Sequence, residues 1–276
     1  MKHCKFGLIG HPIEHSLSPA LFKAGYDGRY TYDLIPGEDF ESSYQRFMDG
    51  YDGINVTAPF KELAYAKADI ISDECRLIKA TNLLVRTPDG VKAYNSDLLG
   101  VRMWLMEILN RPSVASNKTS DFPTTLVVGC GGAGKAAAAA AVTLGMKAVL
   151  MNRNPERAAR LAEDLTGAGF DAEARPLDDF RTCFAEADII IYNIPAPIPE
   201  LTALTKEDFT PGKAKFILEA NYRDPSFDET LLAGMREANP LIQYSSGRTW
   251  LLYQALTGYE IFTEEIPDLD KMSDVL

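Results

Sequence analysis

Short apolar runs alternate with helically periodic stretches along the first hundred residues. The apolar runs predict strands at 6–10, 30–35, 53–57, 80–86 and 91–94. The periodic stretches predict helices at 19–26, 39–48, 61–71 and 97–109. We expect Ser18 to cap the first of these helices, with Pro19 at its first position. This order predicts an α/β domain with a mixed, mainly parallel sheet.

A polar stretch rich in helix-breaking residues follows at 110–123 and predicts a joint between two domains. We therefore expect a first domain at 1–110 and a second domain at 111–246. The remaining segment, 247–276, contains a last predicted helix, which we expect to pack back on the first domain.

Beyond the joint, strands and helices alternate regularly. Thr124–Val128 is an apolar, β-branched run, as expected of a strand buried on both faces of a parallel sheet. Further strands are predicted at 148–151, 188–192 and 216–218, and helices at 135–144 and 154–165. This rhythm is typical of a Rossmann-type, doubly wound sheet.

A glycine-rich loop connects the first strand and helix of the second domain. Its residues are Gly129, Cys130, Gly131, Gly132, Ala133 and Gly134, which fit the pattern G-x-G-x-x-G. The pattern alone is weak, but here a buried strand precedes it and a helix follows it. Such a loop lets the main chain approach a pyrophosphate at the positive end of a helix. We therefore expect dinucleotide binding rather than a plain strand-to-helix turn.

The end of the next strand distinguishes NAD from NADP. An NAD site usually has Asp or Glu there to hold the ribose 2′-hydroxyl. This chain has Asn152, Arg153 and Asn154 instead, with Arg157 one helical turn further on. No carboxylate repels a 2′-phosphate, and two guanidinium groups are available to hold it. The sequence therefore predicts NADP(H) as the cofactor, although both arginines also suit a solvated helix start.

Composition narrows the class of partner. The 276 residues carry 28 Lys and Arg against 39 Asp and Glu, a net charge of −11, which disfavours nucleic acid and anionic membranes as partners. No apolar run reaches the ~20 residues that span a bilayer. Four widely spaced cysteines and three histidines form no metal-binding motif. We expect a cytoplasmic protein with reduced thiols and no metal.

Polar side chains gather at the predicted ends of strands and helices in the first domain. They lie in the segments His15–Pro19, Gly53–Lys61, Ala80–Asn82 and Tyr94–Asp97. Hydroxyl groups and N–H groups ahead of a helix can hold a carboxylate. Each segment taken alone is also typical of turn and cap chemistry.

Taken together, these segments resemble the shikimate dehydrogenase family. The resemblance runs in order along nearly the whole chain: SLSP, NVTAPFK, TN, NSD with LLG, GCGGAG, NR, and Gly247 with Gln254. It implies an NADP-dependent oxidoreductase that reversibly reduces 3-dehydroshikimate to shikimate, a step toward chorismate and the aromatic amino acids.

The resemblance also implies a role for individual residues. Lys61 is the implied catalytic acid–base and Asp97 its partner at the reacting oxygen. The implied substrate-binding residues are Ser16, Ser18, Thr57, Asn82, Asp97, Tyr222 and Gln254. The implied cofactor-binding residues are the glycine loop, the segment Asn152–Asn154 with Arg157, and Ala220, Gly247 and Trp250 near the nicotinamide.

This assignment agrees with the chemistry. Reduction of a ring ketone needs a hydride on carbon, which the cofactor supplies, and a proton on oxygen. A lysine donates that proton well when burial lowers its pKa, whereas a neighbouring carboxylate raises it. The expected substrate is a small polyhydroxylated acid, held in a cleft between the two domains.

The chain departs from the family pattern in three respects. Leu83 and Ser96 stand where the family usually has threonine. The loop Asn193–Pro199 carries three prolines and lacks the usual Gly-Met. Trp250 stands where a methionine usually touches the nicotinamide. The last two changes fall near the reactive end of the cofactor.

Two alternatives stay open. One is a quinate/shikimate dehydrogenase of looser specificity, because the two serine hydroxyls suit either acid. The other is a non-catalytic protein that binds a dinucleotide and senses its redox state, although such a protein would not need Lys61 and Asp97. The sequence is compatible with a monomer or a homodimer.

Overall fold

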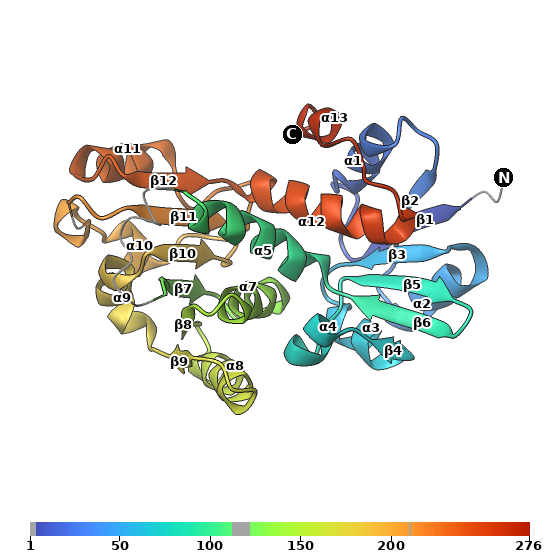
Figure 1. Ribbon diagram of the computed structural model, residues 1–276, viewed down its shortest axis with the longest axis horizontal. Coiled ribbons are helices and arrows are strands. Elements are labelled where there is room, and N and C mark those ends of the chain that lie inside the picture. The colour runs from blue at the N-terminus through green and yellow to red at the C-terminus, as the bar shows by residue number, and fades with distance from the viewer. Residues whose placement is uncertain (1–3, 112–121, 210) are drawn as a thin grey trace. The chain divides into compact units, whose positions relative to one another are not determined.

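The computed structural model describes residues 4–111, 122–209 and 211–276 (Figure 1). The chain forms two compact units: unit 1 contains Met1–Gly100 and Leu252–Leu276, and unit 2 contains Val101–Leu251. Both boundaries fall inside helices, α5 (Ser96–Leu109) and α12 (Gly247–Thr263). Most of the predicted joint at 110–123 lies outside the described residues.

Unit 1 is built on a six-stranded sheet of order β2-β1-β3-β5-β6-β4. Its strands are β1 (Lys5–Gly10), β2 (Thr31–Pro36), β3 (Gly53–Val56), β4 (Ile70–Ile71), β5 (Leu83–Thr87) and β6 (Gly90–Tyr94). The pairs β1–β2, β1–β3 and β4–β6 are parallel, and β3–β5 and β5–β6 are antiparallel. The prediction of a mixed, mainly parallel sheet is confirmed.

Helices cover this sheet. Besides parts of α5 and α12 they are α1 (Ser18–Gly25), α2 (Phe40–Gly50), α3 (Lys61–Lys67), α4 (Asp73–Ile78) and α13 (Leu269–Ser273). The end of α12 packs on the first strand, because the rings of Phe6 and Phe262 stack with centroids 4.9 Å apart. A hydrophobic core cluster of unit 1 includes Ile9, Ile54 and Phe47, all fully buried.

Two local predictions in unit 1 are wrong. The helix predicted at 61–71 ends at Lys67, because Ile70 and Ile71 pair with Lys92 and Ala93 of β6. This long-range pairing overrides the helical pattern of the segment. Ser18 is the first residue of α1 rather than its N-cap, since Leu17 holds that position without a side-chain cap.

Unit 2 contains a fully parallel six-stranded sheet of order β12-β11-β10-β7-β8-β9. Its strands are β7 (Thr124–Val128), β8 (Lys147–Met151), β9 (Ala172–Ala174), β10 (Ile189–Tyr192), β11 (Lys215–Glu219) and β12 (Ile242–Ser245). The chain runs outward from β7 in both directions, which is the doubly wound, Rossmann-type order. The predicted fold class is confirmed.

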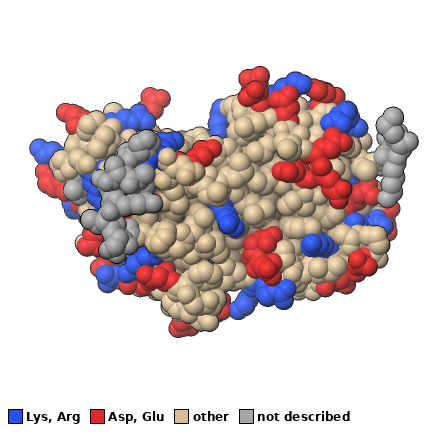
Figure 2. Space-filling view, viewed as in Figure 1, with Lys and Arg blue, Asp and Glu red and all other residues tan. Residues whose placement is uncertain are grey.

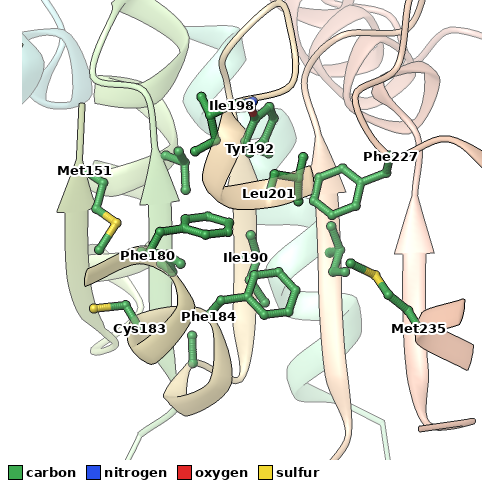
Figure 3. Packing of buried hydrophobic residues seen from close by; sticks show 14 of the residues in the cluster. Met151, Phe180, Cys183, Phe184, Ile190, Tyr192, Ile198, Leu201, Phe227 and Met235 are labelled. Atoms are coloured by element: carbon green, nitrogen blue, oxygen red, sulfur yellow. Dashed lines mark hydrogen bonds between the residues drawn. The ribbon is translucent and has the colours of Figure 1, made fainter. Parts of the chain in front are cut away.

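Among the described residues of unit 2, the helices that lie wholly within the unit are α7 (Gly132–Thr143), α8 (Pro155–Gly167), α9 (Phe180–Glu186), α10 (Pro199–Thr202) and α11 (Glu229–Ala238). Short 3-10 turns lie at Leu177–Asp179 and Lys206–Asp208. The alanine run of α7 is fully buried, so that this helix packs closely on the sheet. In a hydrophobic cluster of unit 2, Phe180 and Phe184 of α9 pack near Ile190 of β10 (Figure 3).

Lys215 is a fully buried basic residue at the start of β11. Its side chain is fully buried in β11, and its ammonium group donates hydrogen bonds to the carbonyls of Phe184 (2.5 Å), Ala185 (3.3 Å) and Ala187. These carbonyls end α9, so Lys215 caps the C-terminus of that helix. Burial lowers the pKa of Lys215 from 10.5 to about 7.

The four cysteines are free thiols. Cys75, Cys130 and Cys183 are buried, and burial raises the pKa of each. On the face shown in Figure 2, acidic and basic side chains of the described residues lie interspersed among uncharged ones.

Candidate active site

The predicted catalytic residues of unit 1 lie together. Lys61 begins α3, and Asp97 lies in the first turn of α5. The Lys61 ammonium donates a hydrogen bond to the Asp97 carboxylate, and the two side chains are only 17% and 14% exposed. The main chain holds both ends of the loop before Lys61: Thr57 N–H donates to the Ile9 carbonyl (3.0 Å) and Thr81 N–H to the Lys61 carbonyl (3.1 Å). The pair is thus fixed and partly shielded from water.

A hydrogen-bond network centred on Ser96 joins two predicted substrate-binding residues. Asn82 donates from Nδ2 to Ser96 Oγ (3.0 Å) and accepts the Ser96 N–H at Oδ1 (2.7 Å). Ser96 Oγ in turn donates to Gln254 Oε1 (3.3 Å). Ser96 directly precedes Asp97, so the same contacts fix the start of α5. In the sequence, Ser96 stands out only as a departure from the family pattern, so this role was not predicted.

Asn55 and Tyr32 extend the network and were also missed. Tyr32 OH donates to Asn55 Oδ1 (2.7 Å), and Asn55 Nδ2 donates to the Asn82 carbonyl (3.4 Å). Burial raises the pKa of Tyr32 well above its usual range, so its hydroxyl stays protonated. The position of Asn55 in the quoted segment NVTAPFK was the available signal, whereas nothing local in the sequence singles out Tyr32.

The two predicted carboxylate-binding serines also lie together. Ser16 Oγ donates to Ser18 Oγ (3.1 Å) and accepts the Ser18 N–H (3.2 Å). Tyr259 of α12, fully buried, donates from its hydroxyl to the Ser18 carbonyl (3.0 Å). Ser18 is buried and Ser16 is half-buried, so Ser16 is the more accessible of the two hydroxyls.

Two glycines allow α5 and α12 to approach closely next to these residues. A Cβ on Gly100 would lie 2.6 Å from the Gln254 backbone nitrogen. A Cβ on Gly258 would lie 2.9 Å from Ser96 Oγ and 3.0 Å from Leu83 Cδ1. The close approach is what brings Gln254 of one helix within hydrogen-bond distance of Ser96 of the other.

In unit 2, the glycine loop has the geometry that a dinucleotide site needs. Gly129 has φ +96°, a conformation that favours glycine. A Cβ on Gly134 would lie 1.7 Å from the Gly129 carbonyl oxygen, so only glycine fits there. Gly131 is exposed with open space beside it, and the first turn of α7 begins at Gly132. The Gly129 N–H donates to the Met151 carbonyl (2.7 Å), so it is the N–H groups of Gly131, Gly132 and Ala133, at the start of α7, that can bind a phosphate.

A second observation at the loop fits a ligand. Asn193, which follows β10, lies beside Gly129 and Gly134, and its buried Oδ1 has no hydrogen-bond partner among the described residues. A buried polar atom is usually paired. The residues present thus fit a bound dinucleotide.

The residues that follow β8 lie next to the glycine loop. Asn152 accepts the Cys130 N–H at Oδ1 (3.1 Å), and Asn154 caps α8 by accepting the Glu156 N–H (3.0 Å). Arg153 and Arg157 are exposed, and neither forms a salt bridge with another described residue. The charge of Arg157 acts on the thiol of Cys130, lowering a pKa that burial raises. Arg153 directly precedes the N-cap Asn154, and Arg157 lies in the first turn of α8.

The loops after β10 and β11 are also fixed. Tyr192 OH donates to the Ala196 carbonyl (2.8 Å) and accepts the Ile198 N–H (3.1 Å), which holds the proline-rich loop Asn193–Pro199. Ala220 follows β11, and a Cβ on Gly247 would lie 2.5 Å from its carbonyl oxygen. Trp250 is buried in α12, and Tyr222 is half-buried.

No group of three or more potential metal ligands occurs among residues 4–111, 122–209 and 211–276. Within the same described ranges, no helix is long and apolar enough to cross a bilayer.

A Rossmann-type unit with an accessible glycine loop, and a unit with a shielded Lys–Asp pair, together define a dinucleotide-dependent oxidoreductase. Comparison with known proteins agrees. Residues 8–84 match the family model "Shikimate dehydrogenase substrate binding domain", and residues 113–217 match "Shikimate / quinate 5-dehydrogenase".

Relatives match over nearly the whole chain. A protein named shikimate dehydrogenase (NADP(+)) from Moorella thermoacetica is 31% identical over 282 residues, which cover 98% of this chain and 91% of the relative. One of the same name from Methanothermobacter thermautotrophicus is 30% identical, covering 98% and 94%. The crystal structure of shikimate 5-dehydrogenase from Thermus thermophilus in complex with NADP(H) and shikimate is 25% identical, with a TM-score of 0.77 and coverage of 99% and 98%.

The chain therefore belongs to the shikimate dehydrogenase family. The resemblance found in the sequence is confirmed. The expectation of an oxidoreductase that uses NADP(H) is also confirmed, at the level of the family.

Proposed function

We propose that this protein is an NADP-dependent shikimate dehydrogenase, which reversibly reduces 3-dehydroshikimate to shikimate on the route to chorismate and the aromatic amino acids. The observation that carries the proposal is the Lys61–Asp97 pair, shielded from water and joined at Asp97 to the Ser96 network. A protein that only bound a dinucleotide would not need a proton donor held in this way.

In the proposed mechanism, NADPH held by the glycine loop would supply the hydride that the ring carbonyl carbon needs. Lys61 donates a proton to the carbonyl oxygen during reduction, and in the reverse direction it accepts the proton back from the hydroxyl group. Asp97 orients the Lys61 ammonium and accepts a hydrogen bond from a ring hydroxyl. Because the pair is largely shielded, the charge of Asp97 acts on Lys61 with little screening by water.

We propose that Ser16 and Ser18 bind the substrate carboxylate, since their hydroxyls lie together beside the start of α1. The proposed contacts to the ring hydroxyls come from Thr57, Asn82, Asp97, Tyr222 and Gln254. The network at Ser96 supports this part: the protein's own hydrogen bonds orient Asn82 and Gln254, which lowers the cost of ordering them on binding.

We propose that the glycine loop holds the cofactor pyrophosphate and that Arg153 and Arg157 bind the 2′-phosphate, with Asn152 and Asn154 shaping that end of the site. Ala220, Gly247 and Trp250 are the proposed neighbours of the nicotinamide. The net charge of −11 supports small-molecule substrates rather than nucleic acid or membrane partners, and the free thiols support a cytoplasmic location.

The test is turnover of shikimate by the purified protein with NADP⁺, followed at the absorbance band of reduced nicotinamide. Lys61→Ala is expected to lower kcat by about 10²–10⁴ with a much smaller change in KM. The matched control is Lys67→Ala in the same helix, because the Lys67 ammonium contacts exposed Glu41 and the Tyr44 ring and not the Lys61–Asp97 pair. A Lys61→Ala variant with full kcat and a raised KM would show that Lys61 binds substrate and does not transfer the proton.

Quinate is the second candidate substrate, because the family model matched by 113–217 covers both acids. The same assay with quinate decides between them. Comparable kcat/KM for both acids would favour a quinate/shikimate dehydrogenase. Binding of NADP⁺ without turnover of either acid would favour the non-catalytic alternative.

A further inference from the structure

Glu219 is a buried acid that the proposed mechanism does not use. It is the last residue of β11 and is fully buried. No salt bridge between described residues includes it, and its carboxylate instead accepts three hydrogen bonds from neutral donors. These are the backbone N–H groups of Ser226 and Phe227 (3.4 Å for the latter) and the hydroxyl of Tyr244 (2.8 Å). A buried carboxylate is tolerated where such donors replace the water that it loses.

These bonds close the base of a loop. Glu219 precedes the loop, and the two N–H groups that it binds lie seven and eight residues further along the chain. Tyr244 reaches the same carboxylate from β12, so the closure is also anchored to the neighbouring strand. Burial raises the pKa of Tyr244, and the hydrogen bond to Glu219 raises it further. The Tyr244 hydroxyl therefore stays protonated and acts as a hydrogen-bond donor.

Asn221 fixes the interior of the same loop. Its Oδ1 accepts the N–H groups of Arg223 (3.1 Å) and Asp224 (3.3 Å). Its Nδ2 donates to the carbonyls of Asp224 (2.6 Å) and Pro195 (3.2 Å), the second of which lies in the proline-rich loop after β10. Tyr222 therefore lies on a segment held at its base by Glu219 and along its length by Asn221.

We propose that Glu219 is a positioning residue for the reaction: by closing the loop that carries Ala220 and Tyr222, it sets the place of Tyr222 against the substrate. The proposal rests on the proposed function, which gives Tyr222 its role. Glu219 touches neither substrate nor cofactor and acts only through the loop.

The first experiment measures the loop directly. Glu219→Gln keeps the size of the side chain but leaves one oxygen, so that an amide NH₂ faces one of the donors. Hydrogen exchange of the amides of residues 220–227 is expected to accelerate at least tenfold in this variant, with exchange in α7 unchanged. Tyr244→Phe is the comparison variant, because it removes the anchor to β12 and leaves both N–H bonds that close the loop; exchange at 220–227 should rise less in it than in Glu219→Gln. Unchanged exchange at 220–227 in Glu219→Gln would overturn the proposal.

The second experiment measures the consequence for catalysis. Glu219→Gln is expected to lower kcat/KM for shikimate about tenfold or more and to change the Kd for NADP⁺ less than threefold. Adding Tyr222→Phe to Glu219→Gln should cost less than the product of the two single losses, because both act through Tyr222. Losses that multiply would show that Glu219 is merely structural. If the unmodified protein does not oxidise shikimate, the proposed function fails, while the exchange experiment still decides whether Glu219 fixes the loop.

Discussion

Replacing Gly100 by alanine tests the close approach of α5 and α12. The new Cβ would lie 2.6 Å from the Gln254 backbone nitrogen, 2.9 Å from the Gln254 Cα and 3.0 Å from the Tyr253 carbonyl carbon. All three atoms belong to the main chain, so no side-chain rotation relieves the contact, and the helices must separate locally.

Two effects of this substitution oppose each other. Alanine in place of glycine within a helix stabilises by ~1 kcal/mol through intrinsic propensity. Overpacking a close contact costs about 1–3 kcal/mol. Because the contacts are with backbone, we expect a cost near the upper end of that range and a net loss of about 1–2 kcal/mol in the free energy of unfolding.

The assay is urea unfolding followed by circular dichroism. Gly234→Ala in α11 is the matched control, because a Cβ there meets nothing within 4 Å. This control should gain up to ~1 kcal/mol from propensity alone. Gly100→Ala should also raise the KM for shikimate, since movement of α12 lengthens the 3.3 Å bond between Ser96 and Gln254. A Gly100→Ala protein as stable as the control would refute the reasoning.

Three further predictions concern other parts of the chain. Arg153→Ala should remove most of a roughly ten- to hundredfold preference for NADP⁺ over NAD⁺, leaving NAD⁺ use nearly unchanged, as measured by kcat/KM for both cofactors; equal values in the unmodified protein would contradict it. Ser16→Ala should raise the KM for shikimate with little effect on the Kd for NADP⁺; equal losses for both ligands would indicate a folding defect instead. Burial lowers the pKa of Lys215 to about 7, so between pH 7 and 10.5 the unfolded chain binds more protons and stability rises with pH. In urea titrations, the free energy of unfolding of the unmodified protein should rise relative to that of Lys215→Met by up to about 1.4 kcal/mol per pH unit between about pH 7 and 9. If the two proteins show parallel curves of unfolding free energy against pH, the pKa of Lys215 is not lowered.

Elements with local signals were predictable from the sequence. The run Thr124–Val128, the glycine loop and the alanine-rich helix follow each other directly, and each is specified by its own residues. The same holds for Asn154, whose cap on α8 is a local contact with Glu156. A site of this kind can be predicted because its parts are neighbours in the chain.

Elements that depend on distant partners were not predictable. The strand Ile70–Ile71 exists because of its pairing with β6, which no local pattern reveals. Tyr32 reaches Asn55 from a different strand. Glu219 was missed because an acid after an apolar strand is usually solvated, whereas here donors from Tyr244 and the returning loop surround it.

The buried thiols have a practical consequence for experiments on folding. Alkylating reagents attack the thiolate, and burial raises the pKa of Cys75 and of Cys130 to about 12. Each thiol therefore reacts only when its surroundings open. Cys75 belongs to unit 1, and Cys130 and Cys183 belong to unit 2. Pulsed alkylation read by peptide mass spectrometry thus follows the opening of each unit separately in the natural sequence, with no engineered probe.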